Sequence, residues 1–342
     1  MLTVDDLAAR TDRAVAAAAA SGRDVGLTVA EPRVLYDVFS VVVHLAPAPV
    51  VVRVPTVLPR TVTADPDAQI AQQRLELDVA GWLADRGHPV VPPSPLVSRE
   101  PIWRDGFSMT FWQFVEQVPD AGPDTNRRSE ITAQLHAALR EYPGELPFLV
   151  PLDASIPDGL AQLEYQPDLL APADLDRAWR EWAMLEPIAC SQAAVEAAFP
   201  GAGVQPVHGD APFYNVIPTP KGELCSDFEH VTLGPVEWDL AFAGLEGQAA
   251  YDAAAARLGL RPLNERLLRV MESARMLQLV ACLALVPQLP MLAEGLRPSL
   301  EQWRTTPLAG GLGQAGSHAE GLARTQRPVI WQVGARRRED RQ

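Results

Sequence analysis

The first part of the chain combines one helical segment with several short β-like runs. Residues 5–20 are rich in alanine and predict a surface helix. Valine, leucine and aromatic residues then concentrate in three runs, of which the last two flank a short proline-rich turn. Such a pattern predicts a β-hairpin. The three runs span residues 33–39, 41–45 and 50–54.

Helical periodicity replaces this pattern at residues 68–86. Four apolar residues there follow the i, i+4, i+7, i+8 spacing that places side chains on one helix face. They are Leu75, Val79, Trp82 and Leu83. Gly87 ends the predicted helix, and an apolar run at 107–115 predicts another strand. We therefore expect a small mixed lobe over residues 1–115.

Residues 116–305 predict a larger, mainly helical lobe. One hairpin is expected at 216–226, where two β-like runs flank a Pro-Lys-Gly turn. The apolar segment 276–292 is too short for a membrane span and contains two prolines, so it predicts a buried helix that ends at them. A Gly- and Arg-rich tail follows over 306–342. The predicted fold class is α+β, with a small β-rich lobe before a helical one.

Composition narrows the functional classes. The formal charge of −14 argues against a protein that grips nucleic acid and disfavours binding to an anionic membrane surface. The three cysteines contain no Cys-x-x-Cys pair, which argues against a zinc knuckle or a disulfide framework. Asp5 and Asp6 stand where a signal peptide would carry basic residues. Together these features favour a reduced, cytoplasmic setting.

The residues with the most chemical information lie between positions 208 and 229. Asp210 is followed by Asn215, and Asp227 comes just after the predicted hairpin. The hairpin should bring Asn215 and Asp227 close together. Phosphoryl transfer from a nucleotide requires a carboxylate near the acceptor hydroxyl and oxygen ligands for Mg²⁺. One Asn and two Asp residues supply these groups.

The ordered set of motifs in this region closely resembles the aminoglycoside phosphotransferase family, which has a protein-kinase-like two-lobe fold. The motifs are His208-Gly209-Asp210 with Asn215, Asp227-Phe228-Glu229, and Glu237-Trp238-Asp239-Leu240-Ala241. The resemblance implies ATP and Mg²⁺ as cofactors. It implies Asp210 as the catalytic base or hydroxyl-orienting group and Asn215 and Asp227 as metal ligands. It also implies structural support of the catalytic loop by His208 and Asp239.

The same resemblance requires a cation on a strand of the small lobe, held by a helix glutamate. Lys221 is the only lysine and lies in the hairpin turn, so Arg53 is the candidate cation. Glu76, on the following helix, is its candidate partner. Because alternate residues of a strand face outward, a solvent-facing Arg53 is the alternative. The turn around Ser40 has no glycine, so no Gly-rich phosphate loop is evident.

By family resemblance the nucleotide base should lie against the strand at 107–115, with backbone groups of Gln113 and Val115 as partners. Phe111 and Trp112 are more typical of a core than of a stacking site. His136 is expected to be a packed helix histidine.

The acceptor is left open by the sequence. Residues 151–205 carry nine acidic and two basic side chains, which would suit an amine-bearing acceptor such as an aminoglycoside or an amino alcohol. An ordinary solvated helix face explains the same charges. Two other classes stay open as well: a catalytically weak nucleotide-binding pseudokinase or regulator, and a hydrolase that uses Asp210 as its nucleophile.

Overall fold

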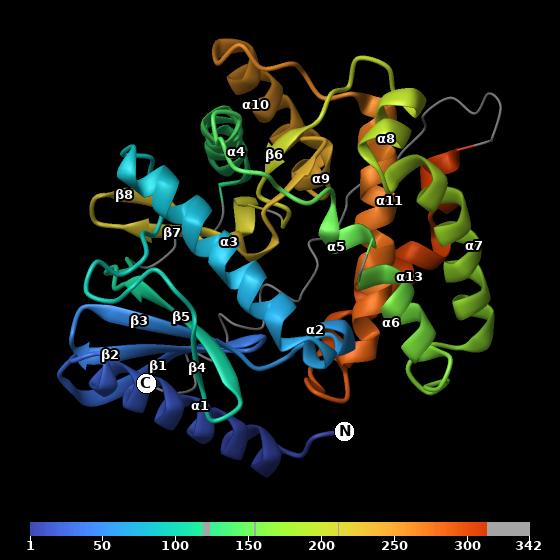
Figure 1. Ribbon diagram of the computed structural model, residues 1–342. Helices are drawn as coiled ribbons and strands as arrows, with labels where there is room; N and C mark the ends of the chain where they lie inside the picture. Colours follow the sequence, from blue (N-terminus) through green and yellow to red (C-terminus); the bar gives the residue numbers. More distant parts are fainter. Residues whose placement is uncertain (119–123, 154, 211, 313–342) are drawn as a thin grey trace.

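The computed structural model describes residues 1–118, 124–153, 155–210 and 212–312, which form two lobes (Figure 1). The strands are β1 (Val29–Asp37), β2 (Ser40–Pro47), β3 (Val50–Pro55), β4 (Ile102–Arg104), β5 (Phe107–Gln113), β6 (Gln205–Val207), β7 (Val216–Thr219), β8 (Gly222–Cys225) and β9 (Thr232–Gly234). The small-lobe helices are α1 (Val4–Asp24), α2 (Arg60–Ala64) and α3 (Pro66–Asp85).

The larger lobe is mainly helical. Its α-helices are α4 (Thr125–Leu139), α5 (Val150–Asp153), α6 (Ser155–Leu163), α7 (Pro172–Ala189), α8 (Gln192–Ala198), α9 (Glu237–Leu240), α10 (Gly244–Arg257), α11 (Glu265–Ala281), α12 (Leu292–Gly295) and α13 (Arg297–Thr305). Its 3₁₀ turns are η1 (Pro212–Tyr214), η2 (Phe228–His230), η3 (Cys282–Leu285) and η4 (Leu308–Gly311). The predicted tail lies outside the described residues from position 313 onward.

The small lobe is an antiparallel sheet, in the order β1-β2-β3-β5-β4, with a helix on each face (Figure 1). Successive side chains of a strand point to opposite faces of the sheet. Val50, Val52 and Val54 of β3 therefore join the cluster under α1, whereas Val51 joins the cluster of α3. Arg53 has the same parity as Val51, so the pleat aims its side chain at α3.

The predicted elements of this lobe are present, with shifted ends. The helices at 5–20 and 68–86 correspond to α1 and α3, and strands β2 and β3 pair as the expected hairpin. The strand expected at 107–115 already ends at Gln113. The pattern did not reveal β4 or α2, because three and five residues are too few to establish a period.

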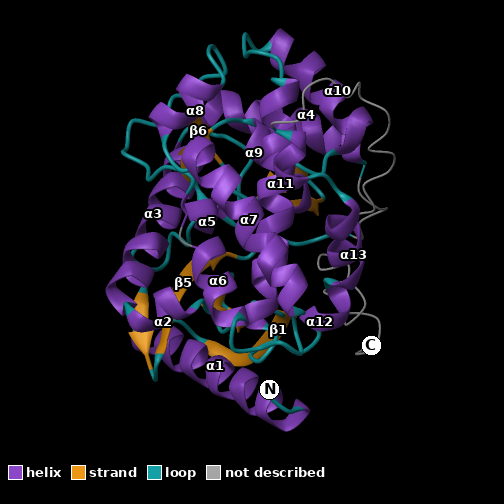
Figure 2. Cartoon of the chain, turned by 90° about the vertical axis from the view of Figure 1, so that its right-hand side faces the viewer, coloured by secondary structure: helices purple, strands orange, loops and turns teal. Residues whose placement is uncertain are grey.

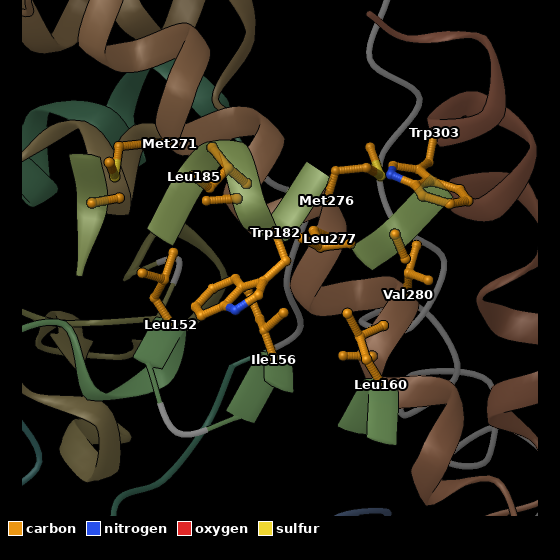
Figure 3. Packing of buried hydrophobic residues seen from close by; sticks show 14 of the residues in the cluster. Leu152, Ile156, Leu160, Trp182, Leu185, Met271, Met276, Leu277, Val280 and Trp303 are labelled. Carbon is orange, nitrogen blue, oxygen red and sulfur yellow. The ribbon is translucent and has the colours of Figure 1, made fainter. Parts of the chain in front are cut away.

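The larger lobe packs around α11, as seen from the side in Figure 2 and at close range in Figure 3. The apolar segment at 276–292 forms the end of α11 and then η3, which stops before Pro287, as predicted. Helices α6 and α11 approach closely at Gly159, where an added Cβ would lie 2.8 Å from the Ala281 carbonyl oxygen. No helix in the described ranges is long and apolar enough to cross a membrane.

The two lobes are also joined away from the chain connection between them. Val38, in the β1–β2 turn, and Val57, after β3, are buried in the same hydrophobic cluster as α6 and α11. The Gln288 side chain donates to the Leu58 carbonyl at 2.8 Å and accepts from the Leu58 N–H at 3.2 Å. The β1–β2 turn, which lacks glycine, therefore packs against the larger lobe.

Candidate active site

The segment His208-Gly209-Asp210 leaves β6 and is held in place by its backbone. Asp239, at the end of α9, accepts hydrogen bonds from the His208 N–H at 2.8 Å and from the Gly209 N–H at 2.9 Å. Trp238 Nε1 donates to the Gly209 carbonyl at 2.7 Å. Since Asp239 and Trp238 are fully buried, these bonds fix the loop to the core of the larger lobe. The geometry agrees with the supporting part expected of Asp239.

Two histidines belong to this support. His136 of α4 contacts Asp239 Oδ2 through Nε2 at 2.9 Å and the Tyr251 hydroxyl through Nδ1 at 2.9 Å. It is fully buried, as expected of a packed helix histidine. His208 contacts the Ser226 carbonyl at 2.9 Å and the Asp210 carbonyl at 3.0 Å, so its ring ties the loop to the end of the hairpin. Tyr251 was not identified from the sequence, because it lies 115 residues from His136.

Position 209 requires a glycine for two reasons, namely its backbone conformation and the lack of space for a side chain. Its φ of +82° is costly for any other residue, and an added Cβ would lie 1.7 Å from the His230 carbonyl oxygen. Gly209→Ala should displace Asp210 and lower kcat by about 100-fold, because a shift of ~1 Å has that effect on positioned groups. Gly201→Ala is the matched control, with φ of +84° and open space around its Cβ. Equal kcat values for the two variants would contradict this account.

Asp210 is held by two donors on its two oxygens. Arg275 Nη2, from α11, donates to Oδ1 at 2.8 Å, and Asn215 Nδ2 donates to Oδ2 at 3.2 Å. Burial, the largest single influence, raises the pKa of this carboxyl, but Arg275 together with the nearby His230 and His208 lowers the pKa to about 2. Asp210 is therefore ionised at neutral pH and fixed in orientation. The sequence did not identify Arg275.

The predicted hairpin brings Asn215 and Asp227 together. Val216 of β7 pairs with Cys225 of β8, and the Ser226 N–H donates to the Asn215 carbonyl at 2.9 Å. Asp227 adopts a left-handed conformation with φ of +65°, which is costly for a non-glycine residue. Its Oδ1 is buried and has no hydrogen-bond partner among the described residues. Backbone strain and a buried oxygen without a hydrogen-bond partner both recur at binding and active sites.

Arg53 joins the small lobe to this region. Its Nη2 lies 2.6 Å from Glu76 Oε2, and its Nη1 lies 2.6 Å from Glu229 Oε2 and 3.7 Å from Asp227 Oδ1. The Arg53 side chain is 11% exposed, which rules out the solvent-facing alternative. The predicted contact with Glu76 is present, whereas the bridge to Glu229 was not predicted. The one sequence feature that could have indicated this bridge is Glu229 itself, the third residue of Asp-Phe-Glu.

Electrostatics around Arg53 favour a bound cation. Burial and then the neighbouring Glu229 raise the pKa of Asp227 to about 6, although Arg53 opposes the rise. Burial also raises the pKa of Glu76, again against Arg53. One guanidinium thus faces three carboxylates, and a further positive charge would stabilise their ionised forms. The described residues contain no group of three or more His, Cys, Asp or Glu side chains arranged to hold a metal.

The two residues predicted to contact the nucleotide base differ in whether their backbone N–H group is already hydrogen-bonded. The Gln113 N–H already donates to the Pro92 carbonyl at 3.0 Å, so it is not free for a base. The Val115 N–H has no hydrogen-bond partner within the described ranges. Phe111 and Trp112 are buried in the core, as expected. Gln113 pairs with Val50, and Val50 lies three residues before Arg53 on the same strand. Gln113 is therefore about 10 Å from Arg53 along the strand direction.

Several acidic residues of 151–205 are bound to partners other than Asp210. Asp174 pairs with Arg304 at 2.6 Å, Glu181 accepts from Trp303 Nε1 at 2.6 Å, and Asp158 accepts from Gln162 at 2.8 Å. In the described part of the chain none of these acids contacts Asp210; the Asp153 side chain lies outside the description. The charged group that does contact Asp210 is the cation Arg275. The packing thus gives the predicted amine site no support.

The arrangement has relatives of known structure. A choline kinase from Streptococcus pneumoniae matches with a TM-score of 0.57 and 14% identity over 84% of this chain and 98% of that chain. A choline/ethanolamine kinase family protein from Mesorhizobium loti matches with a TM-score of 0.53 and 19% identity over 87% and 96% of the two chains. An aminoglycoside 2′-phosphotransferase IIIa mutant in complex with GDP matches with a TM-score of 0.53 and 16% identity over 86% and 97%.

These identities are low and establish the fold, which is the predicted α+β, protein-kinase-like one. No curated protein matches the chain. The model of the phosphotransferase enzyme family (APH) matches residues 38–277, which include every residue placed in the site above. The chain therefore belongs to the phosphotransferase enzyme family, whose members are small-molecule kinases.

Proposed function

We propose that this protein transfers the γ-phosphoryl group of ATP to a hydroxyl of a small molecule, with Mg²⁺ as its metal. The observation that carries the proposal is the convergence of Asp210, Asn215 and Asp227, faced by the Arg53–Glu76 pair of the other lobe. Positioning and charge stabilisation account for nearly all catalysis of phosphoryl transfer, and these five side chains supply both. In solved relatives, complexes with AMP and GDP fit a nucleotide site in this fold.

The donor set fits Mg²⁺. Asp227 Oδ1, which has no hydrogen-bond partner among the described residues, and the amide oxygen of Asn215, whose Nδ2 donates to Asp210, are hard oxygen ligands. Mg²⁺ keeps several waters and takes few protein ligands, so a site with two protein groups suffices. When bound, the ion would offset the negative charge of the phosphates and of the carboxylates around Arg53.

Each residue has a defined part in the proposed transfer. Asp210 Oδ2 orients the acceptor hydroxyl, whose oxygen forms the new bond to phosphorus as the bond to the ADP oxygen breaks. With a pKa of about 2, Asp210 is a weak base, so it takes the hydroxyl proton late in the transfer. Arg53 would contact the phosphates, and the Val115 backbone would bind the base. We further propose that the protein acts in the cytoplasm, where ATP is available.

A catalytically weak nucleotide-binding protein is the second candidate, and one observation favours it. Arg53 is already paired with Glu76 and Glu229 through its two Nη atoms, so carboxylates offset much of its charge before any phosphate is bound. Titration with Mg-ATP, followed by product analysis with a panel of hydroxyl acceptors, separates the candidates. Binding without any phosphorylated product would favour the weak nucleotide-binding protein, and a phosphorylated acceptor would favour the kinase.

Asp227 supplies a specific prediction for the metal. Asp227→Asn keeps the shape of the side chain but removes its charge, so the Kd of Mg-ATP should rise by about tenfold or more, as for loss of a charged ligand. Binding of ATP in EDTA should change little. Isothermal titration calorimetry measures both values, with Asp174→Asn, a carboxylate paired with Arg304, as the control. An unchanged Mg-ATP Kd would remove Asp227 from the metal site.

A further inference from the structure

One face of α11 forms a wall beside Asp210. Arg275, Gln278 and Cys282 recur at i, i+3 and i+7, so they lie on the same side of the helix. Arg275 is buried against Asp210, whereas Gln278 and Cys282 are partly exposed. The wall therefore runs from the catalytic carboxylate toward the surface. It carries a cation, an amide and a thiol, and no acid.

Arg275 is rigidly held in this wall. Its Nη2 donates to Asp210 Oδ1 at 2.8 Å, and its Nη1 donates to Gln278 Oε1 at 2.9 Å. Its guanidinium lies over the Trp238 ring, 5.0 Å from the centroid. Gln278 in turn donates to the Pro151 carbonyl at 3.4 Å. Fixed from several sides, Arg275 is a permanent feature of the surroundings of Asp210.

The guanidinium retains hydrogen-bonding capacity. It has five N–H donors, and two of them serve Asp210 and Gln278. Its Nε is buried and has no partner within the described ranges. Planar arginine donors match vicinal oxygens and carboxylates. An oxygen-rich acceptor whose hydroxyl reaches Asp210 Oδ2 would have further donors at hand on the neighbouring Oδ1 side.

The same geometry disfavours a cationic acceptor. An ammonium group next to the reactive hydroxyl would lie close to Arg275 and would be repelled by it. Asp210 offers little compensation, since its charge is already paired with Arg275 at 2.8 Å. Four acids of 151–205 are bound to residues other than Asp210, namely Asp158, Asp174, Glu181 and Glu196.

We infer that Arg275 and Gln278 select an acceptor whose reactive hydroxyl is flanked by oxygen groups, as in a polyol, a sugar or a hydroxy acid, and not by an amine. This inference rests on the proposed function and defines its substrate class. Arg275 is a positioning residue toward Asp210 and a specificity-determining residue toward the acceptor.

Matched pairs of acceptors test the inference on the wild-type protein. Product formation with Mg-ATP is compared for glycerol and 3-amino-1,2-propanediol, for glucose and glucosamine, and for glycerate and serine, by ³¹P NMR and ADP release. The oxygen-rich member of each active pair should have the higher kcat/KM, by about tenfold. The inference is overturned if the amine members are preferred, or if no oxygen-rich member gives product while Mg-ATP binds. If Mg-ATP does not bind at all, the proposed function fails and the inference falls with it.

Variants assign the preference to the wall. Arg275→Met should lower kcat/KM for the oxygen-rich acceptors by about tenfold or more and narrow the difference within each pair, while the Kd of Mg-ATP stays unchanged. Gln278→Glu, which adds negative charge to the wall, should reduce activity on glycerate more than on glycerol. Arg266→Met, an exposed arginine of the same helix, should change neither value. An unchanged pair preference in both wall variants would overturn the assignment, and the wild-type comparison holds even if Arg275→Met is unstable.

Discussion

Asp210→Asn should reduce kcat for phosphoryl transfer by about 10²–10⁴, the range supplied by a positioned acid–base group. The amide keeps the size of the carboxylate. It has only one oxygen that can accept a hydrogen bond from the substrate hydroxyl, and it cannot take the proton of that hydroxyl. Binding of Mg-ATP should be largely unchanged, because the proposed metal ligands Asn215 and Asp227 are both kept. Steady-state kinetics and calorimetry on the same preparation separate the two effects.

The control for Asp210 is Asp176→Asn, an exposed carboxylate of α7. A residual rate above about one per cent of the wild-type rate would show that Asp210 is not the hydroxyl-orienting group. The wild-type protein distinguishes direct transfer from the hydrolase alternative. A nucleophilic Asp210 would leave a phosphorylated protein detectable by mass spectrometry after a quench, whereas direct transfer leaves none.

Arg53→Met should damage both stability and nucleotide use. Removing the guanidinium leaves Glu76, Glu229 and Asp227 close together without their cation, and loss of one partner from a buried ion pair costs about 3–5 kcal/mol. The KM for ATP should rise, or kcat should fall, by about tenfold or more, because a phosphate contact is also lost. Thermal unfolding and steady-state kinetics measure the two effects.

Arg53→Lys distinguishes the charge of Arg53 from its shape. Lysine keeps the cation, but a single ammonium replaces the fork whose two Nη atoms bind Glu76 and Glu229 separately. Partial recovery of the unfolding temperature is therefore expected. Arg33→Met is the control, since Arg33 pairs with Glu31 on the exposed surface of β1. If Arg53→Met unfolds and turns over ATP like this control, Arg53 has no part in the site.

Local patterns predicted the parts of the site that lie on one element or on adjacent ones. The hairpin of β7 and β8 has a turn signal between two short strands, so its closure brings Asn215 and Asp227 together. The family resemblance required a strand cation held by a helix glutamate, and the position of Arg53 before the helix of Glu76 predicted their contact. These contacts need only the period of a strand or helix and a short connection.

Other contacts depend on packing between distant segments. Arg275 meets Asp210 across 65 residues, and Arg53 meets Glu229 across 176 residues. Neither contact has a spacing that a pattern could reveal. The acids of 151–205 show the converse, because they dominate the charge of their segment, and yet one of them, Asp174, pairs with the distant Arg304. Charge counts along a sequence do not specify which face of a helix lies toward a site.

The sequence alone determined the family, the α+β class and the residues able to hold a metal and a hydroxyl, since these follow from residue type and local spacing. Only the tertiary structure decided what surrounds Asp210. The packing of α11 against the larger lobe places Arg275 there, 2.8 Å from the carboxylate. That position follows from how α6 and α9 bury the apolar face of α11, which is a property of the whole core. The proposed chemistry was thus indicated by the sequence, whereas the inferred preference for an acceptor depends on the fold.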